Sequence, residues 1–192
     1  MGQRILIIQG HPDPGGGRFG HALADAYAAG AESGGHVVRR IEIASLDFPV
    51  LRTREEWESP EPPASIRAAQ DDILWASHVV LFFPLWLGAM PALLKAFLEQ
   101  TLRQSFAFRG GAGQWKPALR GRSAHVVVTM GMPAVVYRWY FGAHSLKGLE
   151  RNILGFCGIK PVRESLVGLV EGSPEGRKRW LRRMEVLGQG GR

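Results

Sequence analysis

The feature that most constrains the fold is an apolar stretch in the middle of the chain that is bounded by two prolines. Residues 79–83 read Val-Val-Leu-Phe-Phe, a run too short for a helix core. It predicts a strand buried on both faces, as in the middle of a parallel sheet. Pro84 ends the strand because it has no N–H to donate, and Pro91 opens a helix where that N–H is not needed. The apolar loop between them lies where open α/β sheets bind ligands.

The rest of the chain alternates between strand-like and helix-like segments. Further strands are expected at residues 5–8, 37–43, 124–128 and 162–170. Helices are expected after Phe19, Pro63, Pro91 and Ser145 and at the basic end of the chain. Gly30 lies on the inward stripe of the first helix and weakens its last turns. Leu74 is expected to point inward, and His125 is interpreted as a core residue with its hydrogen bonds satisfied rather than as a ligand.

Two of the five predicted strands are mixed in character. Residues 37–43 and 162–170 contain arginine and glutamate between apolar residues, which an edge strand tolerates and a central strand does not. The strand order 2-1-3-4-5 of flavodoxin-like proteins puts these two strands outside. The sequence therefore predicts one domain over residues 1–192, an α/β three-layer sandwich around a five-stranded parallel sheet. A polar loop at 44–61 and a Gly- and Arg-rich excursion at 103–121 interrupt this pattern.

Composition and charge narrow the functional classes. Of the 192 residues, 45% are hydrophobic and 21% charged, as in soluble globular proteins. No apolar run is long enough for a membrane span, and the single Cys157 excludes an internal disulfide and any multi-cysteine metal site. We expect a cytoplasmic protein without a secretory signal, an integral membrane segment, a metal site or a nucleic-acid partner. The net charge of +7 sits largely in residues 177–183, either as a solvated helix face or to attract anions such as nucleotide phosphates or a membrane surface.

Three loops follow the three apolar strands and should meet at one edge of the sheet. The first has no dinucleotide or P-loop fingerprint, but its glycines, His11 and Arg18 precede a helix start and suit a phosphate. The second, residues 84–88, offers apolar surface and backbone amides to a planar ring, or it is plain core packing. The third, at Thr129 and Gly131, is a polar rim or an ordinary turn. Together they predict a site for a flavin mononucleotide half.

Two motifs around these loops are well defined. His11-Pro12 is followed by Arg18-Phe19, and Phe-Pro-Leu-Trp at 83–86 is followed by Met-Pro-Ala-Leu-Leu-Lys-Ala-Phe at 90–97. With them the chain resembles the NAD(P)H:quinone oxidoreductase family of flavodoxin-like flavoproteins, which includes ancillary oxidoreductases of bacterial potassium-efflux systems. The likeness is extended over nearly the whole chain by residues 106–108, 129–132 and 153–158.

The resemblance implies a set of flavin-binding residues. They are His11, Arg18, Phe19 and Gly20 for the phosphate and ribityl region, Pro84, Leu85, Trp86, Leu87 and Gly88 along the ring edge, and Thr129, Met130, Gly131 and Met132 on the pyrimidine side. The family's usual Ser or Thr pair before Phe19 is replaced by glycines and Arg18, and Trp86 stands where Gln is frequent. The implied flavin is FMN or FAD, and the implied assembly is a homodimer with the active site at the subunit boundary.

The same resemblance assigns roles beyond the third loop. In the quinone reductases a Tyr and a His sit over the flavin and accommodate the charge that hydride transfer brings. Tyr137 and His144 are the expected catalytic residues, and Tyr140 and Trp86 the expected acceptor-binding residues, although either tyrosine can be the equivalent one. Alternatively, the Tyr-Arg-Trp-Tyr-Phe cluster packs at a dimer interface.

The function expected from this resemblance is oxidoreduction. A hydride would pass from NADH or NADPH to the flavin, and a quinone or similar acceptor would then take two electrons. The alternative is a regulatory flavin- or nucleotide-binding subunit of a transport system. A one-electron carrier of the flavodoxin type fits poorly, because such carriers are usually acidic and this chain carries +7.

Overall fold

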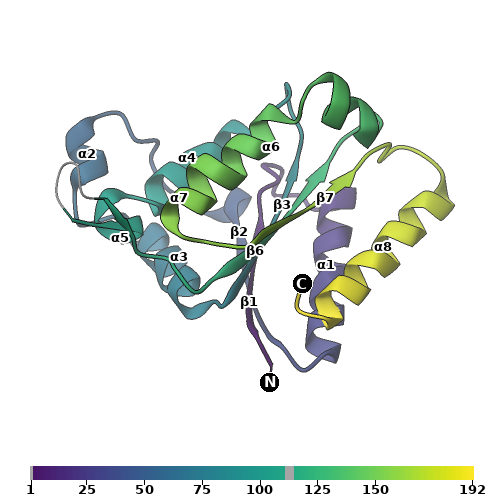
Figure 1. Cartoon of the computed structure of the whole chain (residues 1–192), viewed down its shortest axis with the longest axis horizontal. Helices are drawn as coiled ribbons and strands as arrows, with labels where there is room; N and C mark the ends of the chain where they lie inside the picture. Colours follow the sequence, from purple (N-terminus) through teal and green to yellow (C-terminus); the bar gives the residue numbers. More distant parts are fainter. Residues whose placement is uncertain (1, 111–114) are drawn as a thin grey trace.

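Five parallel strands form the central sheet in the order β2-β1-β3-β6-β7 (Figure 1). The computed structural model describes residues 2–110 and 115–192. The strands are β1 (Arg4–Gln9), β2 (Val37–Glu42), β3 (His78–Pro84), β6 (Ser123–Thr129) and β7 (Val162–Val167). This confirms the predicted order 2-1-3-4-5 and the two mixed strands at the edges. The strand β3 is buried from His78 to Phe83, because it has a neighbouring strand on each side and helices on each face.

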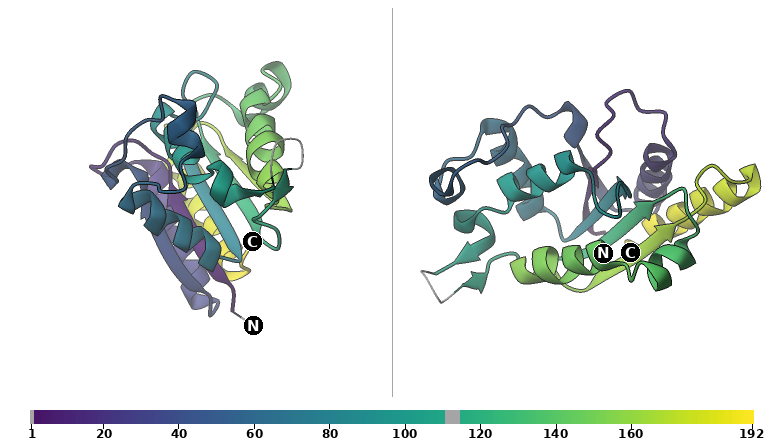
Figure 2. Two further views of the ribbon diagram at one scale, coloured as in Figure 1. Left: turned by 90° about the vertical axis from the view of Figure 1, so that its left-hand side faces the viewer. Right: turned by 90° about the horizontal axis from the view of Figure 1, so that it is seen from above.

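Helices cover both faces of the sheet, as Figures 1 and 2 show. One face packs α1 (Phe19–Ser33) and α8 (Pro174–Gln189) onto a core that includes Ile7 and Phe82. The other face packs α3 (Ala64–Trp75), α4 (Ala92–Thr101), α6 (His144–Gly148), the π-helical segment η3 (Leu149–Leu154) and α7 (Gly155–Cys157). Two separate hydrophobic cores, one on each face, make the predicted three-layer sandwich.

Short elements occupy the segments that the strand–helix pattern left irregular. They are η1 (Ile43–Ser45), α2 (Arg54–Glu58), α5 (Gln104–Ala107), β4 (Phe108–Arg109), β5 (Lys116–Pro117) and the π-helical turn η2 (Val136–Tyr140). Strands β4 and β5 pair as a small antiparallel ribbon apart from the main sheet. The excursion at 103–121 is therefore partly regular, and its residues 111–114 lie outside the described part of the chain.

Two sequence predictions need correction. The last strand ends at Val167 rather than at residue 170, because Leu169 adopts a left-handed backbone with φ of 54° and leaves the sheet. Leu74 is 47% exposed, since α3 turns its buried stripe of Ile66, Ala69 and Ile73 toward the sheet and leaves Leu74 beside it. Neither difference changes the topology.

Helices α1 and α8 pack unusually closely near their carboxyl ends. A Cβ atom on Gly30 would lie 2.0 Å from the backbone oxygen of Glu185 in α8. A Cβ atom on Gly188 would lie 2.0 Å from the backbone oxygen of Tyr27 in α1. Gly30 therefore lowers helix propensity, as predicted, but it is also required for this helix contact.

Buried histidines lie at the amino edge of the sheet. The Nδ1 atom of His125 lies 3.0 Å from the backbone oxygen of Arg192, and its Nε2 atom lies 2.9 Å from the hydroxyl of Ser165. This confirms the interpretation of His125 as a satisfied core residue. Within residues 2–110 and 115–192, no helix combines the length and the apolar character needed to cross a membrane.

Candidate functional site

A cavity of about 470 Å³ lies at the carboxyl edge of the sheet, where the loops after β1, β3 and β6 meet. Ten predicted site residues line it: His11, Arg18, Phe19, Gly20, Pro84, Leu85, Trp86, Thr129, Met130 and Gly131. Four lining residues were not predicted: Gly17, Val170, Glu171 and Arg177. We call this the switch-point cavity, because it lies between β1 and β3, where the strand order reverses.

Gln9 fixes the path of the first loop. Its side chain is buried at the end of β1 and donates through Nε2 to the backbone oxygen of Gly20 over 3.2 Å. Its Oε1 atom accepts the backbone N–H of His11 over 3.1 Å. One amide thus joins the strand end to the first turn of α1, so that the loop returns to the cavity.

Asp13 holds Arg18 in place. Its Oδ1 atom accepts the N–H of Gly15 over 2.9 Å, and its Oδ2 atom accepts from Nε of Arg18 over 2.9 Å. The hydrogen bond from Gly15, together with Arg18, keeps the pKa of the Asp13 carboxyl below its usual value. The carboxylate is therefore charged at neutral pH and orients the guanidinium. The sequence analysis missed this contact, although an Asp two residues before a glycine is a common turn signal.

His11 is positioned as a hydrogen-bond donor. Its Nδ1 atom accepts the N–H of Asp13 over 3.0 Å, so the neutral ring carries its proton on Nε2. Burial, followed by the neighbouring His21, lowers the pKa of His11 below 6.5. The ring of His11 meets that of Trp86 edge-on, with centroids 6.0 Å apart. At neutral pH, His11 is therefore an uncharged side chain beside the apolar loop.

The second loop is a tight turn closed by two backbone hydrogen bonds between Trp86 and Ala89, of 2.8 and 2.9 Å. Leu87 and Gly88 carry positive φ values of 49° and 77° at its tip. The side chain of Leu87 is fully exposed, and neither Leu87 nor Gly88 lines the cavity. The turn presents Leu85 and Trp86 to the cavity and Leu87 to the outside.

The third loop leaves an open floor. Met130 donates its N–H to the backbone oxygen of Val167 over 2.9 Å, which fixes the loop to β7. A Cβ atom on Gly131 would have no neighbour within 4 Å, so a ligand can approach the backbone there. Met132 is partly buried, packs on the core and does not line the cavity.

The predicted catalytic residues lie away from the cavity lining. Tyr137 is only 2% exposed and belongs to the core, where burial raises the pKa of its phenol. Tyr140 is 83% exposed, with its ring 5.0 Å from that of Phe141. His144 is exposed at the start of α6. The structure therefore separates the two tyrosines that the sequence could not distinguish, and the roles of Tyr137 and His144 stay predictions.

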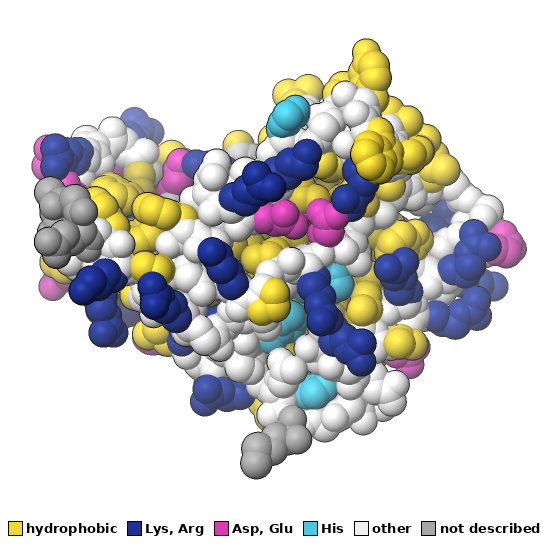
Figure 3. Space-filling model, in the orientation of Figure 1, with side chains coloured by type: hydrophobic (Ala, Val, Ile, Leu, Met, Phe, Trp, Pro, Cys, Tyr) yellow, Lys and Arg dark blue, Asp and Glu magenta, His cyan; other side chains and the backbone are white. Residues whose placement is uncertain are grey.

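Arg177 enters the switch-point cavity from the first turn of α8. Ser173 begins this helix, and its hydroxyl accepts the N–H of Gly176 over 3.1 Å. The Nη1 atom of Arg177 donates to the backbone oxygen of Gly172 over 2.7 Å. The signal in the sequence was the basic run at 177–183, whose side chains gather over α8 at the right of Figure 3.

Arg177 also borders a neighbouring groove between α1 and α8. This groove has a volume of about 430 Å³ and shares Phe19 and Arg177 with the switch-point cavity. Its other walls include Trp180, Arg179 and Arg183. The switch-point cavity thus opens on one side into a basic groove without an acidic residue in its lining.

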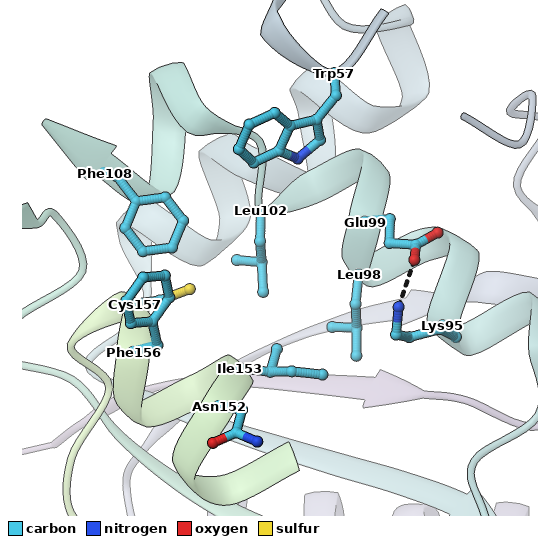
Figure 4. A pocket seen from close by; sticks show the side chains of 10 residues that line it. All are labelled: Trp57, Lys95, Leu98, Glu99, Leu102, Phe108, Asn152, Ile153, Phe156 and Cys157. Atoms are coloured by element: carbon cyan, nitrogen blue, oxygen red, sulfur yellow. Dashed lines mark hydrogen bonds and ion pairs between the residues drawn. The ribbon is translucent and has the colours of Figure 1, made fainter. Parts of the chain in front are cut away.

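A second cavity lies on the α4 side of the molecule and is mainly apolar (Figure 4). The rings of Trp57, Phe108 and Phe156 surround about 230 Å³ above Leu98 and Leu102. Its single cation, Lys95, is paired with Glu99. This aromatic cavity shares no residue with the switch-point cavity, and its lining lacks a free cation for a phosphate.

The chemistry of the switch-point cavity suits a flavin. One end offers two guanidinium groups, a histidine N–H and the open backbone of Gly17, which match a phosphate. The other end offers Pro84, Leu85 and Trp86, which match a planar apolar ring. A ring on one side and an anion on the other is the arrangement that a flavin phosphate requires.

Known proteins share this fold and sequence pattern. Residues 3–186 match the family described as flavodoxin-like fold. An uncharacterized NAD(P)H oxidoreductase of Haemophilus influenzae is 28% identical over 167 residues, which cover 85% of this chain and 82% of that protein. NAD(P)H:quinone oxidoreductase from Methanothermobacter marburgensis superposes with a TM-score of 0.82 at 20% identity, covering 99% of this chain and 96% of that one.

A further solved structure contains a flavin. The FMN-dependent NADH-azoreductase of Bacillus anthracis, in complex with FMN, superposes with a TM-score of 0.74 at 17% identity and covers 97% of both chains. At such identity these two structures establish the fold, and the family match over nearly the whole sequence establishes the kinship. The resemblance of the motifs is thereby confirmed, and the chain belongs to the family of proteins with the flavodoxin-like fold.

Proposed function

We propose that this protein is a flavin-dependent NAD(P)H oxidoreductase that reduces a quinone or a similar planar acceptor. The observation that carries the proposal is the switch-point cavity, in which an anion-binding end and an apolar end meet. The relative from Haemophilus influenzae is named an NAD(P)H oxidoreductase, and the one from Methanothermobacter marburgensis an NAD(P)H:quinone oxidoreductase. These names support the same reaction class.

The residues in the cavity define how a flavin would be held. Arg18, the N–H of His11 and the glycine loop would bind the phosphate and ribityl region, Pro84 to Trp86 would lie along the ring, and Thr129 to Gly131 would meet its pyrimidine side. The bound flavin supplies the redox chemistry, taking a hydride from NADH or NADPH and passing two electrons to the acceptor. FMN is the flavin that we propose, and FAD is the alternative to exclude.

We further propose Tyr140 as the tyrosine that meets the acceptor. Tyr140 is 83% exposed, whereas Tyr137 is 2% exposed and would have to leave the core to touch a ligand. A donor or imidazolium near the pyrimidine end of a reduced flavin stabilises its negative charge, and His144 remains the proposed residue for that task. Tyr140→Phe should raise KM for a benzoquinone, whereas Tyr137→Phe should chiefly lower stability.

A homodimer would cover the apolar surface beside the cavity. Val135, Trp139, Tyr140 and Phe141 are exposed together, and apolar side chains crowd the top of the view in Figure 3. Exposed apolar patches of this kind mark interfaces. Light scattering should give twice the mass of one chain, and Trp139→Asp should shift the protein toward the monomer. A parent protein that is monomeric at tens of micromolar would contradict the dimer.

The proposed activity has a direct test. The purified protein should be yellow and should lose its colour on anaerobic addition of NADH or NADPH. Addition of a benzoquinone should restore the colour, because the acceptor takes the two electrons back. A colourless protein that takes up neither FMN nor FAD would contradict the proposed function.

A further inference from the structure

We propose that Arg177 is the second cation of the flavin phosphate site and acts together with Arg18. This inference rests on the proposed function, since it concerns how the same cavity selects a phosphorylated flavin. Both arginines line the switch-point cavity, although one precedes α1 and the other lies in the first turn of α8. Their side chains thus enter one space from two helices that are distant in the sequence.

The charges around Arg18 show why one arginine is insufficient. Arg18 is paired with Asp13, with 2.8 Å between Nη2 and Oδ2, so the pair carries no net charge. His11 is neutral at physiological pH, because burial lowers its pKa. An FMN phosphate is nearly a dianion at that pH, and charge-assisted hydrogen bonds are the ones that hold it. A further cation is therefore needed.

Arg177 is placed to be that cation. Its Nη1 atom is anchored to the backbone oxygen of Gly172, which leaves Nε and Nη2 free for a bidentate contact. In the part of the chain that the structure describes, Arg177 takes part in no ion pair within 4.0 Å. Glu171 is the acidic residue in the cavity lining; it is exposed and is likewise absent from those pairs.

The competing interpretation is that Arg177 belongs to a solvated basic helix face. The exposed Arg182 represents that face, because it lies on α8 but lines neither the switch-point cavity nor the groove beside it. Arg177 differs from Arg182 by lining both. A matched pair of variants on one helix therefore separates a phosphate-binding role from the general charge of α8.

The test compares two flavins that differ by one phosphate. Apoprotein of the parent, Arg177→Ala, Arg177→Lys and Arg182→Ala is titrated with FMN and with riboflavin, following the quenching of flavin fluorescence. Arg177→Ala should weaken FMN binding by roughly 10- to 100-fold, the scale of a lost charged hydrogen bond, and leave riboflavin binding unchanged. Arg177→Lys should recover part of the affinity, and Arg182→Ala should bind both flavins like the parent.

The outcomes distinguish the inference from the function on which it rests. Equal loss of FMN and riboflavin affinity in Arg177→Ala would assign Arg177 to the structure of the α8 start and overturn the inference. An unchanged FMN affinity would overturn it as well, while the proposed function would stand. A parent protein that binds neither flavin would contradict the proposed function itself. Glu171→Gln gives a test of opposite sign, since removal of a negative charge from the lining should strengthen FMN binding alone.

Discussion

Helices α1 and α8 lie side by side, yet the two ends of the pair differ in purpose (Figure 1). At the carboxyl ends, Gly30 and Gly188 let the backbones touch, and a Cβ atom on either would lie 2.0 Å from a backbone oxygen of the partner helix. At the amino ends, Phe19 and Arg177 border an open groove of about 430 Å³. We call these the closed end and the open end.

The difference teaches what glycine does at each end. At the closed end, glycine removes a side chain so that two helices can approach. At the open end, Gly16 and Gly17 have positive φ values of 65° and 69°, and a Cβ atom on either would have no neighbour within 4 Å. There glycine serves the backbone path and leaves room for a ligand. The predictions below test whether stability depends on the closed end and ligand binding on the open end.

The largest effect is expected from Gly188→Ala at the closed end. The new methyl group would meet backbone atoms of Tyr27 and Ala31, which cannot move aside cheaply. We expect a loss of at least about 3 kcal/mol in the free energy of unfolding, measured by urea denaturation. Gly148→Ala is the control, because a Cβ atom there would have no neighbour within 4 Å. Equal stability of the two variants would contradict a closed end held by helix contact.

Acid should weaken the amino edge of the sheet, next to the closed end. His78 is 2% exposed, and burial, together with His125, Arg163 and His36, lowers its pKa to about 4. The unfolded chain therefore binds a proton below its pKa of 6.5 that the folded chain refuses, so stability falls as the pH drops from 6.5 to about 4. The loss should be roughly 3 kcal/mol at most.

Urea denaturation at several pH values checks this prediction. The variant His78→Gln keeps a polar side chain beside Ser123, whose hydroxyl lies 2.8 Å from Nδ1 of His78. Its stability should depend less on pH than that of the parent between pH 6.5 and 4. Parallel pH curves for the two proteins would show that His78 does not carry the effect.

Removal of Arg18 should act on the ligand and spare the fold. Arg18 is exposed and contacts Asp13 in a loop, so the core loses nothing in Arg18→Ala. We expect FMN affinity to fall by roughly 1.5–3 kcal/mol and Arg18→Lys to recover only part, because a lysine lacks the planar fork. Isothermal titration with FMN measures both, and FAD is titrated in parallel. Unchanged affinity for FMN and FAD would leave Arg18 without a role.

The smallest effect is expected from Ser173→Ala at the start of α8. The Ser173 hydroxyl accepts the N–H of Gly176, and its loss should lower stability by about 1 kcal/mol. Because the same turn carries Arg177, FMN affinity should fall slightly while riboflavin affinity stays constant. Ser65→Ala is a suitable control, since Ser65 bonds the backbone of Asp47 on the other face of the sheet. Thermal unfolding and fluorescence titration would show the difference.

Much of the fold could be predicted because it depends on local patterns. The runs at 5–8, 79–83 and 124–128 are apolar throughout, and this identifies central strands irrespective of other contacts. The arginines of β2 and β7 placed these strands at the edges for the same reason. The switch-point cavity followed from topology alone, because parallel strands end at the same edge.

The remaining parts depend on contacts between distant segments. Arg177 reaches the cavity only because β7 ends at Val167 and the turn before α8 bends back, and neither feature has a local signal. The aromatic cavity needs Trp57, Phe108 and Phe156 from three separate elements. The burial of Tyr137 and the exposure of Tyr140 depend on the π-helical turn η2, whose spacing a regular helix pattern does not predict.

Hydrogen exchange with and without FMN tests the central claim most directly, because exchange reports local opening residue by residue. FMN should slow exchange in the loops at residues 9–20, 84–89 and 129–132 and at residues 171–177, all at the open end. Exchange around Gly30 and Gly188 should not change, since that contact is already closed. Protection confined to the aromatic cavity, or none in these loops at saturating FMN, would contradict a flavin site at the carboxyl edge of the sheet.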